Sequence, residues 1–313
     1  MLYHRVLVTG ANGLVGQAVV RRFTAVPEID VLATSREDHP RFQTANCGYV
    51  PLDLTDTEAV RNVFMDFAPR SVINCAAIAK VEACEADREA CWAVNVEAVE
   101  TLASACRAHG TRLIQVSTDF VFDGETPPYA EDEYPAPVNY YGRSKLAAEN
   151  AVRGAGLHRW AVARTALVYG AGEDLRRRNI AVWLCSALKA GETVRVVTDL
   201  IRTPTFVDDL ADGLLRIEWR GKSGLYHLAG RETMTVFDFA RRLAVHFGFD
   251  PELVQPITAE ALHPGHPRPR ATPLLILRAE SELGYKPRPL DAALDRLGTT
   301  LGIPVPNKKT ATR

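Results

Sequence analysis

The first half of the chain alternates short apolar runs with longer amphipathic segments. We interpret the apolar runs as strands at 5–10, 30–35, 48–53, 71–77, 112–117 and 160–170, and the segments with helical spacing as helices at 14–25, 55–67, 87–109 and 139–154. Strands of this length that are separated by helices pair in parallel through right-handed crossovers, so that helices cover both faces of the sheet. The pattern therefore predicts an α/β fold with a doubly wound parallel sheet of the Rossmann type.

The pattern changes after residue 170. Helical spacing appears at 174–190, 204–217, 235–248 and 278–284, short apolar runs appear at 193–197 and 224–230, and proline-rich loops lie between them. We interpret residues 1–170 plus about 205–230 as one domain. Residues about 171–204 plus 231–300 would form a smaller, discontinuous α/β cap, and 301–313 a polar tail.

Composition narrows the class of protein. The 313 residues carry 37 Lys and Arg against 38 Asp and Glu, a formal net charge of -1, and 47% of them are hydrophobic. Such a balance gives neither the basic footprint of nucleic-acid binding nor a general attraction to anionic membranes. No run approaches the ~20 apolar residues of a membrane helix, and the first residues lack the pattern of a signal peptide. We therefore expect a cytoplasmic protein without a nucleic-acid or membrane partner.

The cysteines favour a reducing compartment. None of the six forms a C-x-x-C pair, and no histidine stands beside them at metal-ligand spacing. We expect reduced thiols that pack as small apolar residues, and no metal site. The six are Cys47, Cys75, Cys84, Cys91, Cys106 and Cys185.

The first apolar run leads directly into "VTGANGLVG", which places Gly10, Gly13 and Gly16 just before a segment with helical spacing. Gly10 would permit a tight turn, Gly13 would let the backbone approach a pyrophosphate, and Gly16 would let helix and strand pack closely. The pyrophosphate would lie at the positive end of the helix. Such glycines can also form a merely structural turn, but the strand–loop–helix setting favours dinucleotide binding by this loop, including Asn12 and Leu14.

The end of the second strand bears on the choice between NAD and NADP. A carboxylate there binds the ribose 2′-hydroxyl of NAD, whereas an arginine can pair with the 2′-phosphate of NADP. The chain has Ser35 and Arg36 at this place, followed by Glu37 and Asp38. Arg36 could instead be an ordinary loop residue, but the sequence favours NADP(H), with NAD(H) possible. The further expected cofactor contacts are Asp53, which could instead cap a helix, Leu54, Ala76 and Ala77.

The segment "YYGRSK" at 140–145 places Tyr141 and Lys145 four residues apart, so that on a helix they share one face. Tyrosine is a poor acid at neutral pH, with an unperturbed pKa of about 10, and a neighbouring ammonium shifts that pKa towards the working range. Upstream, the fifth apolar run ends in the hydroxyls of Ser117 and Thr118, at the sheet edge where such folds bind ligands. Together with the glycine loop, this order predicts ketone reduction by hydride and proton transfer.

These motifs together resemble the extended short-chain dehydrogenase/reductase family. "TGANGLVG", "NCAA", "VN" at 94–95, "STDFVFDG" and "YYGRSK" stand in that family's order, and "STDFVFDG", "RTPTFVDDLADGL" and "LGYKPRPL" are similar to its dTDP-4-dehydrorhamnose reductase-like branch. The resemblance covers nearly the whole chain. It implies a catalytic triad of Thr118, Tyr141 and Lys145, in which Tyr141 is the acid and Lys145 also holds the nicotinamide ribose. It further implies support of the site by Asn95, and a homodimer.

Departures from the family pattern concern the substrate. In related nucleotide-sugar dehydratases an Asp-Glu pair follows the threonine, but here Asp119 is followed by Phe120, which cannot abstract a proton, so we expect no dehydration. The segments around 200 and 271 also depart from the reductase pattern, which leaves the particular sugar open. We expect Thr118, Asp119, Phe120 and Arg202 to contact the substrate, with Arg202 on its diphosphate. Other cationic candidates are Arg176, Arg177, Arg178, Arg268 and Arg270.

The sequence thus leads to an expected function with two rivals. The leading hypothesis is an NADP(H)-dependent reductase of a 4-keto-6-deoxy nucleotide sugar, with dTDP-4-dehydrorhamnose as the expected substrate. The larger domain would bind the cofactor and the cap would bind the sugar. One rival is a nucleotide-sugar epimerase that retains bound NAD. The other is a non-catalytic regulatory subunit that binds NADP and docks on a partner enzyme.

Overall fold

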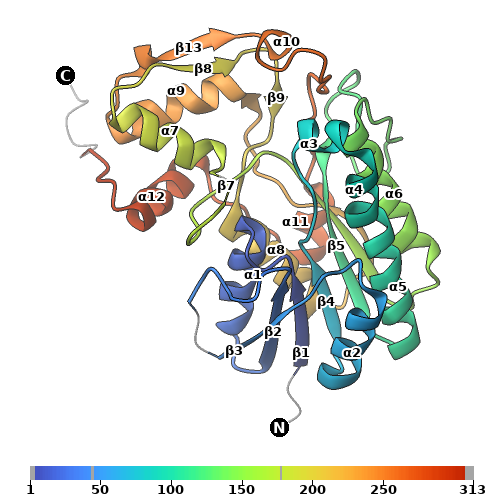
Figure 1. Cartoon of the computed structure of the whole chain (residues 1–313). Helices are drawn as coiled ribbons and strands as arrows, with labels where there is room; N and C mark the ends of the chain where they lie inside the picture. Colours follow the sequence, from blue (N-terminus) through green and yellow to red (C-terminus); the bar gives the residue numbers. More distant parts are fainter. Residues whose placement is uncertain (1–3, 44–45, 177, 307–313) are drawn as a thin grey trace.

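A parallel sheet of seven strands forms the centre of the larger lobe (Figure 1). The computed structural model describes residues 4–43, 46–176 and 178–306. The strand order is β11-β6-β5-β4-β1-β2-β3, and every pairing is parallel. The predicted doubly wound α/β fold is therefore confirmed. The strands are β1 (His4–Thr9), β2 (Ile29–Ser35), β3 (Cys47–Pro51), β4 (Ser71–Asn74), β5 (Arg112–Thr118), β6 (Trp160–Thr165) and β11 (Gly224–His227).

Helices cover both faces of this sheet, because successive strand residues point to opposite sides. In β4, Val72 belongs to the core beneath one layer of helices and Ile73 to the core beneath the other. The first layer comprises α2 (Thr57–Phe67), α5 (Ala98–His109) and α6 (Tyr140–Gly154). The second comprises α1 (Leu14–Thr24), α8 (Val207–Trp219) and α11 (Leu277–Leu283).

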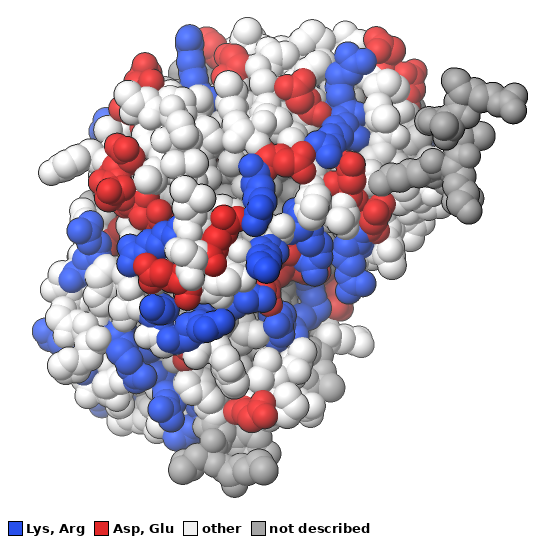
Figure 2. All heavy atoms as spheres, turned by 180° about the vertical axis from the view of Figure 1, so that it is seen from behind, with Lys and Arg blue, Asp and Glu red and all other residues white. Residues whose placement is uncertain are grey.

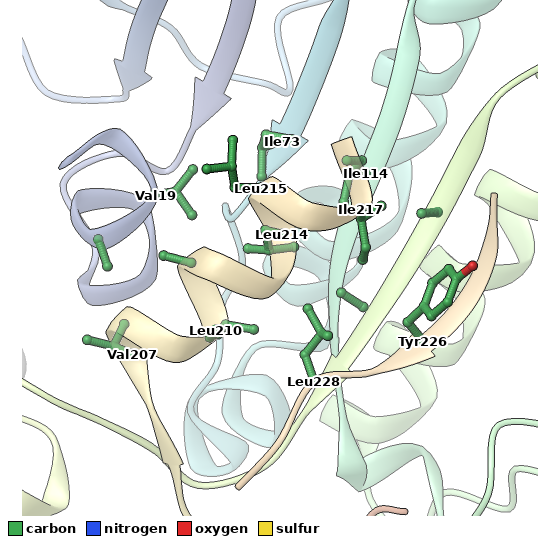
Figure 3. Close-up of a cluster of buried hydrophobic side chains, with 14 of the residues drawn as sticks. Val19, Ile73, Ile114, Val207, Leu210, Leu214, Leu215, Ile217, Tyr226 and Leu228 are labelled. Atoms are coloured by element: carbon green, nitrogen blue, oxygen red, sulfur yellow. The ribbon is translucent and has the colours of Figure 1, made fainter. Parts of the chain in front are cut away.

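Helix α8 shows how the second layer is held. Its apolar stripe includes Leu210 and Leu214, which are fully buried. Figure 3 shows α8 lying between Val19 of α1 and the sheet side chains Ile73 and Ile114. Burying such side chains contributes roughly 1.5–3 kcal/mol each. This packing fixes the helix that follows the glycine loop against the sheet.

Several strand and helix boundaries differ from the sequence prediction. The predicted strand 160–170 is two strands, because the backbone turns at Leu167, whose φ is +41°, and β7 (Val168–Tyr169) then pairs with β10 (Thr205–Phe206). The fourth strand ends at Asn74 rather than at 77. The predicted helix 174–190 begins only at α7 (Ile180–Lys189), where the side chain of Asn179 caps the first turn.

The cap, whose β8 (Val194–Val197), β13 (Val254–Ile257) and α9 (Val236–Phe247) lie at the top of Figure 1, has an apolar core separate from those of the larger lobe. Its parallel pair β8 and β13 packs against α9. The helix α12 (Leu290–Leu301), which also belongs to the cap, was not predicted from the sequence. Residues 274–285, which the sequence assigned to the cap, instead contribute buried side chains to the core of the larger lobe. The cap elements are α7, β8 (Val194–Val197), β9 (Ile201–Arg202), β12 (Met234–Thr235), α9 (Val236–Phe247), β13 (Val254–Ile257), α10 (Ala259–Leu262) and α12 (Leu290–Leu301).

The surface carries charges of both signs. Figure 2 shows Lys and Arg gathered in a band across the middle and lower part of one face, with Asp and Glu interspersed among them. Ion pairs such as Arg22–Asp212 and Arg278–Glu282 are part of this mixture. No helix among the described residues has the length and apolar character needed to cross a membrane. Of the expected tail at 301–313, residues 307–313 lie outside the described residues.

Candidate active site

The glycine loop between β1 and α1 has two glycines that no other residue could replace without movement. Gly10 has a φ of +65°, and a Cβ there would lie 2.6 Å from the backbone nitrogen of Ala76. A Cβ on Gly16 would lie 2.3 Å from the carbonyl oxygen of Gly10. Gly13 is exposed, and a Cβ there would find its nearest atom 3.3 Å away. Gly10 and Gly16 thus serve packing, while Gly13 leaves its backbone open to a ligand at the helix N-terminus.

The end of β2 carries a polar network around Asn12. The Asn12 amide donates to Ser35 Oγ at 2.9 Å and to Glu37 Oε2 at 2.7 Å. The guanidinium groups of Arg41 and Arg176 also pair with the Glu37 carboxylate, and the hydrogen bond from Arg41 holds the Glu37 pKa below its usual value. Arg36 is exposed beside Ser35. The Glu37 carboxylate at this end of the strand is therefore compensated by two arginines. The exposed Arg36 acts on another carboxylate, Asp53, whose pKa is lowered by hydrogen bonds from Thr55 and by the Arg36 charge.

Five more predicted cofactor residues have distinct environments. Asp53 is exposed, and its Oδ1 accepts from the backbone nitrogen of Thr55 at 2.9 Å, so it forms a turn before α2. Leu54 is buried in the core beneath α2. Ala76 and Ala77 follow β4, half-buried, and Ala76 lies directly against Gly10. Leu14, also predicted, is the first residue of α1 and is half-buried.

A segment of the cap crosses to the glycine-loop helix. Gln17 of α1 donates to the carbonyl oxygen of Glu173 at 2.8 Å and accepts from its backbone nitrogen at 2.8 Å. Arg41 pairs with Asp174 at 3.2 Å. In Figure 1 this stretch, between β7 and α7, descends to α1. These contacts join the cap to the glycine-loop helix beside the polar network around Asn12.

Helix α6 presents Tyr141 and Lys145 one turn apart, as the spacing predicted. The side chain of Asn139 caps its first turn by accepting from the backbone nitrogen of Gly142 at 2.8 Å. Lys145 is buried, and its Nζ donates to the carbonyl oxygen of Val116 on β5 at 2.8 Å. Burial lowers the pKa of Lys145 to about 8, against the opposing effect of Glu149. The ammonium is therefore held in a fixed place by the sheet.

Tyr141 lies beside the 3-10 turn Asp119–Val121 that follows β5. Its ring packs edge-on against Phe120, with 5.7 Å between the ring centroids. Gly142 permits this approach, because a Cβ there would lie 2.2 Å from the carbonyl oxygen of Phe120. Thr118 ends β5, and its Oγ1 accepts from the backbone nitrogen of Phe120 at 3.2 Å. The structure thus brings Thr118, Phe120, Tyr141 and Lys145 to one place at the carboxyl edge of the sheet.

Asn95 connects this place to the loop after β4. It lies in a π-helical turn at Ala93–Glu97, between α4 (Arg88–Trp92) and α5, within the stretch predicted as one helix. Its side chain accepts from the backbone nitrogen of Ile78 at 2.8 Å and donates to Ser144 Oγ at 2.9 Å. Single π-helical turns of this kind occur frequently at functional sites. Asn95 therefore ties the loop beside Gly10 to the helix of Tyr141.

Asp119 and Arg202, both predicted to contact substrate, pair with each other. Each side chain is 3% exposed, and Arg202 Nε lies 3.1 Å from Asp119 Oδ2. The Arg202 guanidinium also donates to the carbonyl oxygens of Ile201, Pro269 and Arg270. Asp119 in turn accepts from the hydroxyls of Thr118 and Thr272. Arg202 therefore serves as a buried link between the strand edge and the 269–272 loop, rather than as an exposed cation for a diphosphate.

The other cationic candidates are scattered. Arg176 pairs with Glu37 at 2.8 Å, Arg268 pairs with Glu82, and Arg178 donates to Ser186 at 3.2 Å. Arg270 is exposed next to the carbonyls that Arg202 holds. Arg177 lies outside the described residues.

Sequence reasoning missed the residues behind Lys145. Glu149 is completely buried, and it accepts from Ser117 Oγ at 2.5 Å and from Arg164 Nη2 at 2.7 Å. The signal was present, since Glu149 follows Lys145 by four residues and must share its helix face. The Ser117 hydroxyl, considered above as a ligand-binding group, is thus hydrogen-bonded to Glu149 in the interior. All six cysteines are unbridged.

The comparisons with known proteins agree with this geometry. The family described as the RmlD substrate binding domain matches residues 4–302. A probable low-salt glycan biosynthesis reductase from Haloferax volcanii is 37% identical over 88% of this chain and 91% of its own length. A dTDP-4-keto-6-deoxy-D-glucose reductase from Streptomyces niveus is 35% identical over 86% of this chain and 88% of its own length.

Two further relatives bear on function in different ways. A crystal structure of dTDP-4-dehydrorhamnose reductase from Bacillus anthracis in complex with NADP has a TM-score of 0.84 and 27% identity, over 95% of this chain and 99% of that one. The methionine adenosyltransferase 2 subunit beta from Mus musculus is 33% identical over 81% of this chain and 75% of its own length. The chain therefore belongs to the RmlD substrate binding domain family, within the extended short-chain dehydrogenases/reductases.

Proposed function

We propose that this protein is an NADP(H)-dependent reductase of a 4-keto-6-deoxy nucleotide sugar, with dTDP-4-dehydrorhamnose as its substrate. One observation carries the proposal: Tyr141 and a buried Lys145 stand one turn apart on α6, with the Lys145 ammonium fixed on the Val116 carbonyl. The side chain of Asn95 joins Ser144 on α6 to Ile78, in the loop after β4 whose Ala76 lies against Gly10. The proton-transfer pair and the glycine loop therefore belong to one site.

The residues present suit a bound dinucleotide. The open backbone at Gly13 and the N-terminus of α1 would hold its pyrophosphate, and the small side chains of Ala76 and Ala77 leave room for a flat ring system. The nicotinamide, when bound, supplies the hydride for the substrate carbonyl carbon. Lys145 of α6, whose ammonium is hydrogen-bonded to Val116 of β5, would hold the nicotinamide ribose.

In the reduction, the chain's own residues would manage the proton. Tyr141 donates it to the carbonyl oxygen as that oxygen gains charge, and the adjacent ammonium of Lys145 stabilises the resulting tyrosinate. Thr118 Oγ1, which donates to Asp119 in this structure, would turn its hydrogen to the same carbonyl oxygen and orient it. Phe120, where a base would be needed for dehydration, packs against Tyr141 and cannot take a proton.

The choice of NADP(H) rests on the end of β2. Glu37, the nearest acid after the strand, is already paired with Arg41 and Arg176, while Arg36 is exposed. The exposed Arg36 guanidinium would pair with a 2′-phosphate. The Bacillus anthracis relative has NADP bound.

The choice of substrate rests on the relatives and on the cap. Two of them are named as reductases of dTDP-linked 4-keto or 4-dehydro sugars. In this proposal the larger lobe, which includes α11, binds the cofactor and the cap binds the sugar. Arg270 of the 269–272 loop replaces Arg202 as the cation that we assign to the diphosphate.

The test is a direct assay. Purified protein is mixed with NADPH and dTDP-4-keto-6-deoxy sugars, including dTDP-4-dehydrorhamnose, and absorbance at the NADPH band is followed. We expect consumption of NADPH in proportion to the reduced sugar formed. Conversion of a nucleotide sugar without net NADPH consumption would instead identify an epimerase.

A regulatory role is a second candidate because one relative is named as the beta subunit of another enzyme. The intact set Thr118, Tyr141 and Lys145 favours catalysis. Tight NADPH binding with no turnover of any 4-keto nucleotide sugar, together with a co-purifying enzyme, would favour the regulatory role and contradict the first.

A further inference from the structure

A buried charge network lies on the side of Lys145 away from the site. Glu149 is 0% exposed, and both of its oxygens are occupied by Arg164: Nε lies 3.0 Å from Oε1 and Nη2 lies 2.7 Å from Oε2. Ser117 Oγ donates to Oε1 at 2.5 Å. Because a guanidinium that donates to both oxygens pairs with a carboxylate, Glu149 is a fixed negative charge in the interior.

Three consecutive residues of β5 connect this network to the proposed catalytic groups. Val116 accepts from Lys145 through its carbonyl oxygen, Ser117 donates to Glu149, and Thr118 reaches the opposite side of the strand end. Lys145 and Glu149 are also four residues apart on α6. A shift of Glu149 would therefore displace both the strand and the helix that hold the ammonium.

Lys145 needs such a counter-charge because its surroundings oppose ionisation. Burial is the largest influence on Lys145 and lowers its pKa to about 8, and the charge of Glu149 is the largest opposing influence. Among the thiols that face Lys145, burial raises the pKa of Cys75 to about 12, whereas the hydrogen bond with Cys84 lowers the pKa of Cys91 to about 7. The groups facing Lys145 are Glu149 and Tyr141 of its own helix, Cys75 after β4, Cys84 of α3 (Val81–Ala86) and Cys91 of α4.

The ionisable groups on the far side of Glu149 are not among those that shift the pKa of Lys145. Arg164 faces Glu149, Glu131 and His227, and burial together with the Arg164 charge lowers the pKa of His227 to about 3. His227 is therefore neutral, and Glu131 accepts from its backbone nitrogen at 2.9 Å. Within the part of the chain that the structure describes, Glu149 is the carboxylate that acts on Lys145.

We propose that Glu149, held by Arg164 and Ser117, is a positioning residue for hydride transfer: it keeps the Lys145 ammonium charged and in place. This role rests on the proposed function, because it acts through Lys145. Glu149 touches neither substrate nor cofactor in this account.

Removal of the Glu149 charge changes the pH dependence in a definite direction. The reductase needs Lys145 charged and Tyr141 protonated, so the alkaline limb of kcat/KM falls as either group loses its proton. Without the carboxylate, the Lys145 pKa is lower, because the charge of Glu149 is the largest influence that raises it. This change moves the alkaline limb to lower pH.

The experiment measures kcat/KM for ketone reduction from pH 6 to pH 10 in the wild type and its variants. For Glu149→Gln we expect the alkaline limb to move down by about one pH unit, which is about a tenfold loss at a fixed pH on that limb. Glu149→Asp keeps the charge, so its limb should stay within a few tenths of the wild-type position. The matched controls Glu100→Gln on α5 and Arg153→Gln on α6, both exposed, should leave the limb unchanged.

The double variant Glu149→Gln/Arg164→Gln keeps the test decisive if the single variant fails to fold, because it removes both buried charges together. The alkaline limb of its kcat/KM profile should also lie at a lower pH than that of the wild type. The pH at which NADPH binding weakens should move in the same direction, which gives a readout that does not need turnover. A uniform loss of kcat at every pH with an unmoved limb would overturn the proposal, since that is the result of a purely structural pair.

The failure of this inference can be told apart from failure of the proposed function. If Tyr141→Phe and Lys145→Met remain active, the reductase mechanism itself is wrong. If both are inactive and the Glu149→Gln limb does not move, only the role of Glu149 is wrong.

Discussion

Neighbouring residues at the end of β5 do different work because a strand turns alternate side chains to opposite faces. Ser117 points to the buried Glu149, whereas Thr118 lies at the site and bonds to the turn of Phe120. The same division occurs at the end of β2, where Ser35 is bonded to Asn12 and Arg36 is exposed. At the residue scale, the face to which a side chain points decides its role as much as its residue type does.

Arg36 gives a prediction about cofactor choice. Arg36→Ala should raise the Kd of NADPH about tenfold or more, because a charge-assisted contact to phosphate is worth roughly 1.5–3 kcal/mol. The Kd of NADH should change little, since NADH lacks the 2′-phosphate. Fluorescence titration with both cofactors checks this, with the exposed Arg61→Ala on α2 as the control. Equal weakening of both cofactors would argue against this role for Arg36.

At the scale of elements, α6 and the turn after β5 form the site by close approach. Gly142 is the residue that allows it, since the carbonyl oxygen of Phe120 occupies the place where a Cβ would stand. Asn139 fixes where the helix begins, and Lys145 fixes its inner face to β5. Tyr141 is thereby held between a capped helix end and an aromatic ring.

Helix α6 contains a matched pair of glycines for a test. Gly142→Ala should push α6 from the turn and lower kcat at least tenfold, because catalysis needs the reacting groups within a few tenths of an ångström. Gly154→Ala, at the other end of α6 and with no atom within 4 Å of its Cβ position, should keep full activity and gain roughly 0.5–1 kcal/mol of stability. Steady-state kinetics and thermal unfolding of both variants check this. Equal effects of the two substitutions would contradict the close-approach account.

The elements also show what the sequence could predict. The parallel sheet, the glycine loop and the Tyr141–Lys145 pair follow from periodicity and spacing, which are local properties. The break at Leu167 and the role of Arg202 could not be predicted, because both depend on tertiary partners: β10 for the first, and Asp119 with the 269–272 loop for the second. Helix α12 was missed because its sequence follows a proline-rich segment that favoured a loop.

At the scale of the whole molecule, buried polar links join the cap to the sheet. Arg202 of β9 pairs with Asp119 after β5, and Gln17 of α1 bonds both backbone groups of Glu173. An ion pair buried on both sides holds one relative placement, because a lost partner leaves an uncompensated charge in the interior. These links set where the cap stands over the edge of the sheet.

Arg202 tests that view of the molecule. Arg202→Met should lower the free energy of unfolding by about 3–5 kcal/mol, because Asp119 then remains buried without its cation. The exposed neighbour Arg270→Met should leave stability within about 0.5 kcal/mol and raise the KM for the nucleotide sugar. Denaturant unfolding and kinetics separate the two effects. Unchanged stability of Arg202→Met with a raised KM would restore Arg202 as the direct substrate cation.

The central claim is that Tyr141 gives the proton in a ketone reduction supported by NADPH. The most direct measurement is single-turnover oxidation of bound NADPH by a 4-keto-6-deoxy nucleotide sugar in wild-type protein and in Tyr141→Phe. The account predicts that the variant binds NADPH with near-wild-type affinity but transfers hydride at least about 10²-fold more slowly. Hydride transfer at the wild-type rate in Tyr141→Phe would contradict it.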